Sequence, residues 1–216
     1  MKTRLILVRH GQSTANLVDR FAGHIDVPLT ELGIKQGKST GEFLKNEKID
    51  AFYSSDLQRA YDTACFCAKY HNKPVIKDAG LKEINGGEWE NLTYPEIAKE
   101  YPEGYKIWVT NIGLTQCPGG ESVKDVQNRI FKTVKKIAQE HQGKTVFIGI
   151  HGMALRAFVL KVLDLPLEKM QTDLFWTSNA AVTYIDYEDG KFTLIKYGQD
   201  EHLKKAGLIS VLHAKA

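Results

Sequence analysis

The stretch Arg4-Leu-Ile-Leu-Val-Arg-His-Gly11 decides the fold class, because a short apolar run ends directly in basic and polar residues. The run from Arg4 to Val8 has the apolar character of a β-strand that is covered on both faces. Arg9 and His10 follow where this strand ends, and Gly11 allows close approach of the backbone after them. The stretch therefore predicts a buried parallel strand with two basic side chains at its carboxyl end.

The same pattern occurs twice more along the chain. The apolar segment Ile49–Ser54 leads to Arg59, and the segment Thr145–Ile150 is followed directly by His151. In open α/β sheets, ligands bind beyond the carboxyl ends of the strands. We therefore expect Arg59 and His151 to meet the two basic residues of the first strand in one pocket.

Stretches of helical period alternate with these strands, which favours an α/β domain with a largely parallel sheet. In the clearest helix, one apolar stripe runs along the segment, and Ser122 with Asp125 resembles a capping box. Near the end of the chain, Asp189-Gly190 predicts the turn of a hairpin added to a sheet edge. The expected helices are Thr30–Asn46, Leu57–Tyr70, Ser122–His141 and Met153–Leu163, with a weaker strand at Pro74–Lys77 and hairpin strands at Ala181–Asp186 and Phe192–Tyr197.

These elements predict a single domain over residues 1–216. We expect a three-layer α/β sandwich in which helices flank a mostly parallel central sheet with one antiparallel edge strand. The segment 83–120 mixes glycine, proline and aromatic residues without a clear period. We expect this segment to form an irregular cover over the pocket.

Composition excludes several classes of function. The 216 residues are 43% hydrophobic and 25% charged, which is typical of a soluble globular protein. The net charge of +3 is too small to indicate a nucleic-acid partner. No apolar run approaches the roughly 20 residues that span a bilayer, and no signal-peptide pattern begins the chain. With three cysteines, which cannot all pair, we expect a cytoplasmic protein without membrane contact, either a monomer or a homodimer.

Two histidines and two arginines in one pocket suit a phosphorylated ligand, because a guanidinium group binds phosphate oxygens bidentately. Alone, Arg9-His10-Gly11 is a weak signal, since three residues recur by chance. The matching His151-Gly152, again at a strand end, strengthens it. The sequence has no Cys-x-x-Cys pair and no P-loop, so we expect neither a metal nor a cofactor.

The ordered set of motifs resembles the histidine phosphatase superfamily, which includes cofactor-dependent phosphoglycerate mutase. The resemblance covers nearly the whole chain and departs from the usual pattern at Asn91 and at Ile148-Gly149-Ile150, where a serine commonly precedes the histidine. The matching segments are Leu7-Val-Arg-His-Gly-Gln-Ser13 with Asn16, Asp26-Val-Pro-Leu-Thr-Glu-Leu-Gly33, Ser54-Ser-Asp-Leu-Gln-Arg-Ala60 with Thr63-Ala64, Leu81-Lys-Glu83, Gly87-Glu-Trp-Glu90, Pro118-Gly-Gly-Glu-Ser122 with Arg129, and His151-Gly152.

The resemblance implies a phosphoglycerate mutase-like fold and a phosphohistidine mechanism. It implies that His10 becomes phosphorylated and that Glu83 is the proton donor, in preference to its sequence neighbours Glu88 and Glu90. Further roles implied are binding of the transferred phosphoryl group by Arg9, Arg59 and His151, assistance by Asn16, and substrate contacts by Gly23 and Gly152. The implied substrate is a small phosphorylated metabolite.

Phosphatase and mutase activity are the main alternatives. A mutase must retain a carboxylated bisphosphate and keep water from the phosphohistidine, which calls for extra cationic groups and a substantial cover. In the segment 83–120, six glutamates and two lysines give a net charge of −4. This acidic, fairly short cover favours hydrolysis, and an inactive relative that serves as a binding or scaffold module is the second alternative.

Overall fold

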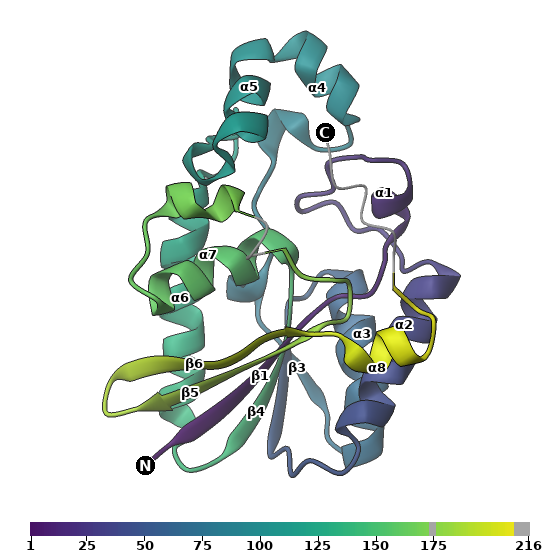
Figure 1. Cartoon of the computed structure of the whole chain (residues 1–216), viewed down its shortest axis with the longest axis vertical. Helices are drawn as coiled ribbons and strands as arrows, with labels where there is room; N and C mark the ends of the chain where they lie inside the picture. Colours follow the sequence, from purple (N-terminus) through teal and green to yellow (C-terminus); the bar gives the residue numbers. More distant parts are fainter. Residues whose placement is uncertain (173–175, 210–216) are drawn as a thin grey trace.

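The computed structural model describes residues 1–172 and 176–209, and its central feature is a six-stranded sheet between helices (Figure 1). The order of the strands in the sheet is β3-β2-β4-β1-β5-β6. The first four of these are parallel, whereas β5 is antiparallel to β1 and β6 is antiparallel to β5. The strands are β1 (Thr3–Arg9), β2 (Ala51–Ser54), β3 (Val75–Lys77), β4 (Thr145–Ile150), β5 (Val182–Glu188) and β6 (Lys191–Gln199).

The predicted α/β architecture, the mostly parallel sheet and the hairpin at the sheet edge are confirmed. The antiparallel strand β5 lies one position in from the edge, because β6 pairs on its outer side. Between them, Asp189 and Gly190 have φ angles of 50° and 81°. Two consecutive positive φ angles are what a tight two-residue hairpin turn requires, and Asp-Gly adopts them readily.

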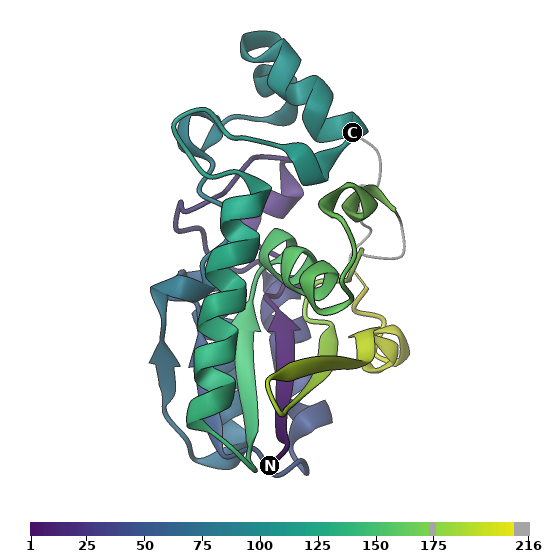
Figure 2. The same cartoon turned by 90° about the vertical axis from the view of Figure 1, so that its left-hand side faces the viewer.

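Helices cover both faces of the sheet (Figures 1 and 2). One face carries α2 (Glu31–Leu44) and α3 (Gln58–Ala68), and the other carries α6 (Val123–Glu140) and α7 (Gly152–Val162). Side chains of β1 alternate between the two faces, as the pleat of a strand dictates. Leu5 and Leu7 join the core beneath α6 and α7, while Ile6 and Val8 join the core on the opposite side. The central strand is therefore buried on both faces, as its apolar run predicts. Outside the segment 83–120, the described residues also form the short helices α1 (Thr14–Leu17) and α8 (Glu201–Lys205) and 3₁₀ turns at Lys69–His71, Ala79–Leu81 and Leu167–Gln171.

Two predicted helix starts have the expected caps. The hydroxyl of Thr30 accepts a hydrogen bond from the amide of Gly33 at 3.0 Å and begins α2. Ser122 and Asp125 form a reciprocal capping box at the start of α6, with each side chain bound to the backbone of the other. These caps satisfy amide groups that have no partner within the first turn of a helix.

The cover segment 83–120 is more regular than predicted. It contains α4 (Tyr94–Glu100), α5 (Pro102–Thr110) and 3₁₀ turns at Gly87–Trp89 and Ile112–Leu114. Both helices have proline in the first turn, where its missing N–H and fixed φ are compatible with a helix. The prolines that suggested irregular structure therefore start helices instead. In Figure 1, α4 and α5 lie above the carboxyl ends of the parallel strands.

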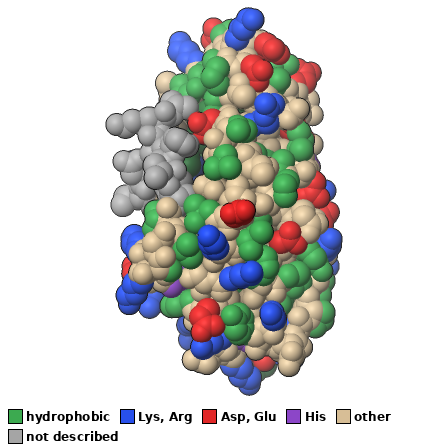
Figure 3. Space-filling model, turned by 90° about the vertical axis from the view of Figure 1, so that its right-hand side faces the viewer, with side chains coloured by type: hydrophobic (Ala, Val, Ile, Leu, Met, Phe, Trp, Pro, Cys, Tyr) green, Lys and Arg blue, Asp and Glu red, His purple; other side chains and the backbone are tan. Residues whose placement is uncertain are grey.

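In the view of Figure 3, acidic, basic and hydrophobic side chains are mixed with one another. Among the helices of the described residues, none is both long and apolar enough to traverse a lipid bilayer.

Candidate active site

The carboxyl ends of the parallel strands open into a cavity of about 140 Å³. Parallel pairing places Arg9 of β1 opposite Ile150 of β4, so the residues that follow each strand are neighbours. The rings of His10 and His151 accordingly lie 5.1 Å apart between centroids. Seven of the eight residues singled out in the sequence line this cavity, and His151 adjoins it through His10. The seven are Arg9, His10, Asn16, Gly23, Arg59, Glu83 and Gly152.

His10 is held as a neutral imidazole with a defined tautomer. Its Nδ1 lies 2.7 Å from the carbonyl oxygen of Gly11, and because a carbonyl oxygen only accepts, Nδ1 carries the proton. Nε2 then has a free lone pair. Burial, followed by the charges of Arg59 and Arg9, holds the pKa of His10 well below its usual value. A nucleophilic nitrogen is therefore available at neutral pH.

His151 occupies the N-cap position of α7 without a capping hydrogen bond from its side chain, and it is fully buried. Burial, and then the charges on Arg59 and His10, hold its pKa well below the usual value for histidine. Neither ring nitrogen has a hydrogen-bond partner among the described residues. Because buried polar atoms are rarely left without partners, these nitrogens are suited to contact a bound ligand.

Two guanidinium groups flank the histidines. Arg59 is 1% exposed and donates to the carbonyl oxygens of Gly23 at 2.8 Å and Ile25 at 2.9 Å. Arg9 donates to the carbonyl oxygen of Thr177, and its Nε has no partner among the described residues. Burial lowers the pKa of both arginines, although guanidinium groups keep their charge at neutral pH. Two fixed positive charges thus face the imidazole of His10.

Glycine is required where the loop after β1 packs against the start of α2. A Cβ on Gly11 would lie 2.4 Å from the carbonyl oxygen of Gly33, and a Cβ on Gly33 would lie 2.0 Å from that of Gln12. The hydroxyl of Thr63 accepts from the amide of Gly11 at 3.0 Å and donates to the carbonyl of Arg59 at 2.8 Å. The loop that holds His10 is therefore tied to α2 and α3 at once.

Gly23 is a second position where a larger residue does not fit. Its φ is +49°, and a Cβ there would lie 2.3 Å from Oε1 of Glu90. The same oxygen accepts from the amides of His24 at 2.7 Å and Gly86 at 3.0 Å. Glu90 therefore has a structural role, whereas Glu88 is exposed.

Asn16 is oriented by hydrogen bonds to its side-chain oxygen. This Oδ1 accepts from the amide of Ser13 at 3.0 Å, the hydroxyl of Ser13 at 3.1 Å and Nδ2 of Asn179 at 3.4 Å. With the oxygen occupied, the NH₂ group of Asn16 is left as a donor on the wall of the cavity. Asn179 also donates to the carbonyl oxygen of His10 at 3.2 Å.

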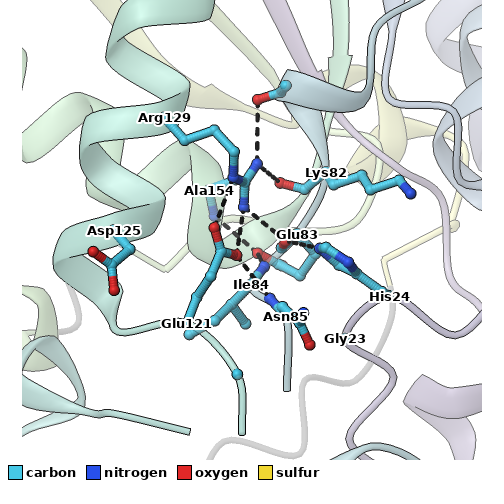
Figure 4. Close-up of polar contacts among 12 residues, drawn as sticks. Gly23, His24, Lys82, Glu83, Ile84, Asn85, Glu121, Asp125, Arg129 and Ala154 are labelled. Atoms are coloured by element: carbon cyan, nitrogen blue, oxygen red, sulfur yellow. Dashed lines mark hydrogen bonds and ion pairs between the residues drawn. The ribbon is translucent and has the colours of Figure 1, made fainter. Parts of the chain in front are cut away.

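The carboxylate of Glu83 rests on the first turn of α7 (Figure 4). Oε2 accepts from the amide of Met153 at 3.0 Å, and Oε1 accepts from the amides of Ala154 and Ile84, each at 3.0 Å. The first amides of a helix have no acceptor within the helix and attract a negative group. Glu83 is therefore fixed by the same helix that begins beside His151.

A second group of contacts holds the backbone of Glu83 (Figure 4). Arg129 donates to the carbonyl oxygens of Glu83 at 3.0 Å and Lys82 at 2.9 Å. It also forms a two-point ion pair with Glu121, at 2.8 and 2.7 Å. The ring of His24 adds a second hydrogen bond, at 2.9 Å, to the same Glu83 carbonyl. The position of the carboxylate thus depends on α6 as well as on α7.

Two side chains at the site, those of Asn179 and Arg156, were not foreseen from the sequence. Asn179 lies three residues before Val182, the first residue of β5, and because β5 is antiparallel to β1, its start lies at the carboxyl ends of the parallel strands. This antiparallel topology was the signal from which the position of Asn179 near the site could have been predicted. Arg156 was a lone charge within an apolar helix, which is a signal in itself. The cover contributes Tyr94 and Trp108, and Trp108 packs edge-on against the fully buried Trp89 at 6.0 Å.

No three histidine, cysteine, aspartate or glutamate side chains gather as a metal site within residues 1–172 and 176–209. The groups that converge instead are a neutral imidazole, fixed cations and one carboxylate. A strand-end cationic cavity of this kind defines an α/β enzyme that handles phosphoryl groups.

The chain belongs to the histidine phosphatase superfamily (branch 1), whose family model matches residues 5–200. It is 34% identical over 200 residues to phosphoserine phosphatase 1 of Hydrogenobacter thermophilus, covering 93% of this chain and 94% of that protein. It is 33% identical to the metal-independent phosphoserine phosphatase of Arabidopsis thaliana, covering 96% of this chain and 86% of that protein. Among solved structures, YhfR of Bacillus stearothermophilus superposes with a TM-score of 0.89 at 31% identity, over 93% of this chain and 99% of that one.

Proposed function

We propose that this protein is a phosphomonoesterase that hydrolyses small phosphorylated metabolites through a phosphohistidine formed on His10. The observation that carries the proposal is the tautomer of this residue. Nδ1 is bound to the Gly11 carbonyl at 2.7 Å, which leaves the Nε2 lone pair free in a cavity lined by Arg9 and Arg59. A nucleophile of this kind divides one difficult displacement into two easier steps.

In the first step, Nε2 of His10 attacks phosphorus, the N–P bond forms and the P–O bond to the alcohol breaks. Glu83 delivers its proton to the departing oxygen. Oε2 accepts only one hydrogen bond from the described residues, so it is the oxygen with room for that proton. Arg9, Arg59 and His151 stabilise the negative charge on the equatorial oxygens, with the amide of Asn16 assisting.

In the second step, the Glu83 carboxylate takes a proton from water while that water attacks the phosphohistidine. The N–P bond breaks, its electron pair returns to Nε2, and inorganic phosphate leaves. Glu83 again holds a proton and the cycle closes. Acid and base are the same residue because the second step reverses the proton transfer of the first.

Three features support hydrolysis over transfer to a second substrate. The cover is acidic and consists of two short helices, α4 and α5. Two relatives that match more than nine-tenths of this chain bear the names of phosphoserine phosphatases, and a third of similar coverage is named phosphoglycerate mutase-like protein 4. A cofactor-dependent phosphoglycerate mutase from Gloeobacter violaceus matches a smaller part, 77% of this chain.

We propose a cytoplasmic location as well, because the three cysteines are free thiols.

Trapping of the phosphoenzyme tests this proposal. Wild type, His10→Ala and the control His71→Ala are mixed with a ³²P-labelled monoester in the presence of a chelator and quenched. Label that is stable in base and lost in acid is expected on the wild type and on His71→Ala, whose ring packs on Phe52. His10→Ala should carry no label and lose at least about 10³-fold in kcat. Label on His10→Ala, or phosphoglycerate interconversion that outruns phosphate release, would contradict the proposal.

A further inference from the structure

The proposed mechanism leaves one buried cation of the cavity without a task. Arg156 lies on α7, one turn beyond Gly152, and its side chain lines the same cavity as Arg9 and His10. It is 3% exposed, so its charge is almost wholly removed from water. Burial of an ionised group is unfavourable unless partners compensate for the lost hydration.

The partners that Arg156 has are not charged. Its Nη2 donates to the carbonyl oxygen of Met170, and its guanidinium carbon lies 4.1 Å above the ring of Trp176. Its Nε has no acceptor, and no carboxylate of the described residues pairs with it. Burial lowers the pKa of Arg156 to about 10, which still leaves the group charged at neutral pH. The donor at Nε and the positive charge are therefore available to a ligand.

Charge balance indicates what kind of ligand fits. The cavity has three such guanidinium groups, from Arg9, Arg59 and Arg156, and Glu83 is the one carboxylate among its described lining residues. When Glu83 carries the proton that it must deliver, the three cations face only the substrate. A phosphomonoester dianion neutralises two of them and leaves one positive charge. Arg20 also lines the cavity, but it binds the carbonyl of Asn91 in an exposed position.

The wall near Arg156 restricts the ligand further. The ring of Trp176 covers one face of the guanidinium, so an anion must approach along its edge, where the N–H groups lie. A planar carboxylate matches this edge in shape, and its single charge completes the balance. A second phosphate dianion would leave an excess of negative charge.

We propose that Arg156, backed by Trp176, forms a subsite for a carboxylate on the alcohol portion of the substrate. The preferred substrates are then small phosphomonoesters that carry one carboxylate. This inference rests on the proposed function and assigns a specificity-determining role to a residue outside the phosphoryl-transfer step.

Matched pairs of substrates test the subsite, because each pair differs in the carboxylate. O-phosphoserine is compared with O-phosphoethanolamine, and 3-phosphoglycerate is compared with glycerol 3-phosphate, by kcat/KM for phosphate release. Wild type is expected to prefer the carboxylated member by about tenfold to a hundredfold, as for a charge-assisted hydrogen bond. In Arg156→Met this ratio should fall to about one, with the uncarboxylated members changed by no more than about threefold. Arg156→Lys keeps the charge but not the planar edge, so its ratio of kcat/KM values should lie between those of wild type and Arg156→Met.

The possible failures are distinguishable. Equal kcat/KM for both members of each pair in wild type would overturn the subsite while the phosphatase stands, and so would a uniform loss on all four substrates in Arg156→Met. If no monoester is hydrolysed, the proposed function fails and the subsite with it. If Arg156→Met does not fold, the carboxylate subsite is tested on the wild type instead, by inhibition of 4-nitrophenyl phosphate hydrolysis with glycerate and with glycerol. Glycerate should inhibit more strongly than glycerol, and equal inhibition would overturn the proposal.

Discussion

Arg129 binds the backbone of Glu83, with Nη2 of the arginine 3.0 Å from the carbonyl oxygen of the glutamate. The same guanidinium also reaches the carbonyl oxygens of Lys82 and Gly80, at 2.9 and 3.2 Å. One side chain of α6 therefore holds, by hydrogen bonds to three carbonyl oxygens, the backbone segment that carries the proposed proton donor. Arg129 does not line the cavity, so it acts on the reaction from a distance, through the position of Glu83 and through its charge, which helps to lower the pKa of His151.

We predict that Arg129→Met slows proton delivery selectively. In single turnover, release of an alkyl alcohol should fall by about tenfold to a hundredfold, because a displaced carboxyl group loses alignment. Release of 4-nitrophenol, a good leaving group, should change by no more than about threefold. Arg129→Lys should recover part of the alkyl rate. Equal losses for both leaving groups would show that Arg129 acts on the whole site and not through Glu83.

The matched control for this variant is Arg4→Met. Arg4 forms a two-point ion pair with Asp186 at the opposite end of β1. Loss of this partly buried pair should lower the free energy of unfolding by about 1–3 kcal/mol. It should leave the ratio of alkyl to aryl rates unchanged, which separates a general loss of stability from loss of alignment.

Glu83→Gln should block the second step more visibly than the first. An amide cannot take a proton from water, so we expect steady-state kcat to fall by about 10²–10⁴-fold. With 4-nitrophenyl phosphate, the first step needs little help, and stopped-flow absorbance should record a burst of nitrophenol equal to the enzyme concentration. Glu88→Gln, at the exposed neighbouring acid, should show normal turnover without a burst. Turnover of Glu83→Gln at the wild-type rate would exclude Glu83 as acid and base.

Stability should fall in mild acid because two histidines have lowered pKa values. In the folded protein the pKa values of His10 and His151 lie well below the usual value, whereas in the unfolded chain they return to about 6.5. Below that pH the unfolded state binds more protons, so the free energy of unfolding decreases until the folded pKa is passed.

Each histidine contributes a slope of at most about 1.4 kcal/mol per pH unit in that window. Denaturant unfolding of wild type and His151→Asn at pH 7.5, 6.0 and 5.0, in buffers without phosphate, measures how steeply the free energy of unfolding changes with pH. The free energy of unfolding of His151→Asn should decrease less between pH 7.5 and pH 5.0 than that of wild type. Identical slopes would mean that His151 does not titrate differently in the two states.

Gly33→Ala should affect both stability and turnover. A Cβ at this position would lie 2.0 Å from the carbonyl oxygen of Gln12, so the loop after His10 must move. We expect a loss of about 1–3 kcal/mol in unfolding free energy, as for other overpacked sites, together with reduced kcat. Gly190→Ala is the control: nothing lies within 4 Å, and only its φ of 81° is unfavourable. Gly190→Ala should lower the free energy of unfolding by about 1 kcal/mol and leave kcat unchanged.

The sequence was informative where one local pattern determined the structure. The apolar runs of β1 and β4 are buried on both faces and could hardly be anything but central strands. The caps at Thr30 and Ser122 depend on residues three positions apart. The clustering of strand-end residues also followed, because parallel strands present their carboxyl ends at one edge of a sheet.

Features that depend on distant contacts were not predictable in the same way. Nothing near Glu83 in the sequence indicates that its carboxylate accepts from the amides of Met153 and Ala154. Arg156 was hidden because a single arginine in an apolar helix has no local partner that reveals its direction. The helices α4 and α5 were missed because proline suggests a break in a chain until its place in a first turn is known.

The central position of β1 has a consequence for how the protein is made. This strand is synthesised before the rest of the sheet, yet its two neighbours in the sheet are β4, which begins at Thr145, and β5, which begins at Val182. At a translation rate of roughly 5–20 residues per second, β1 waits on the order of ten seconds on the ribosome for a partner. The loop with His10 also lacks Asn179 during that time. A nascent chain therefore completes its reactive centre only after residue 179 has been made, and the apolar strand β1 needs protection from aggregation until then.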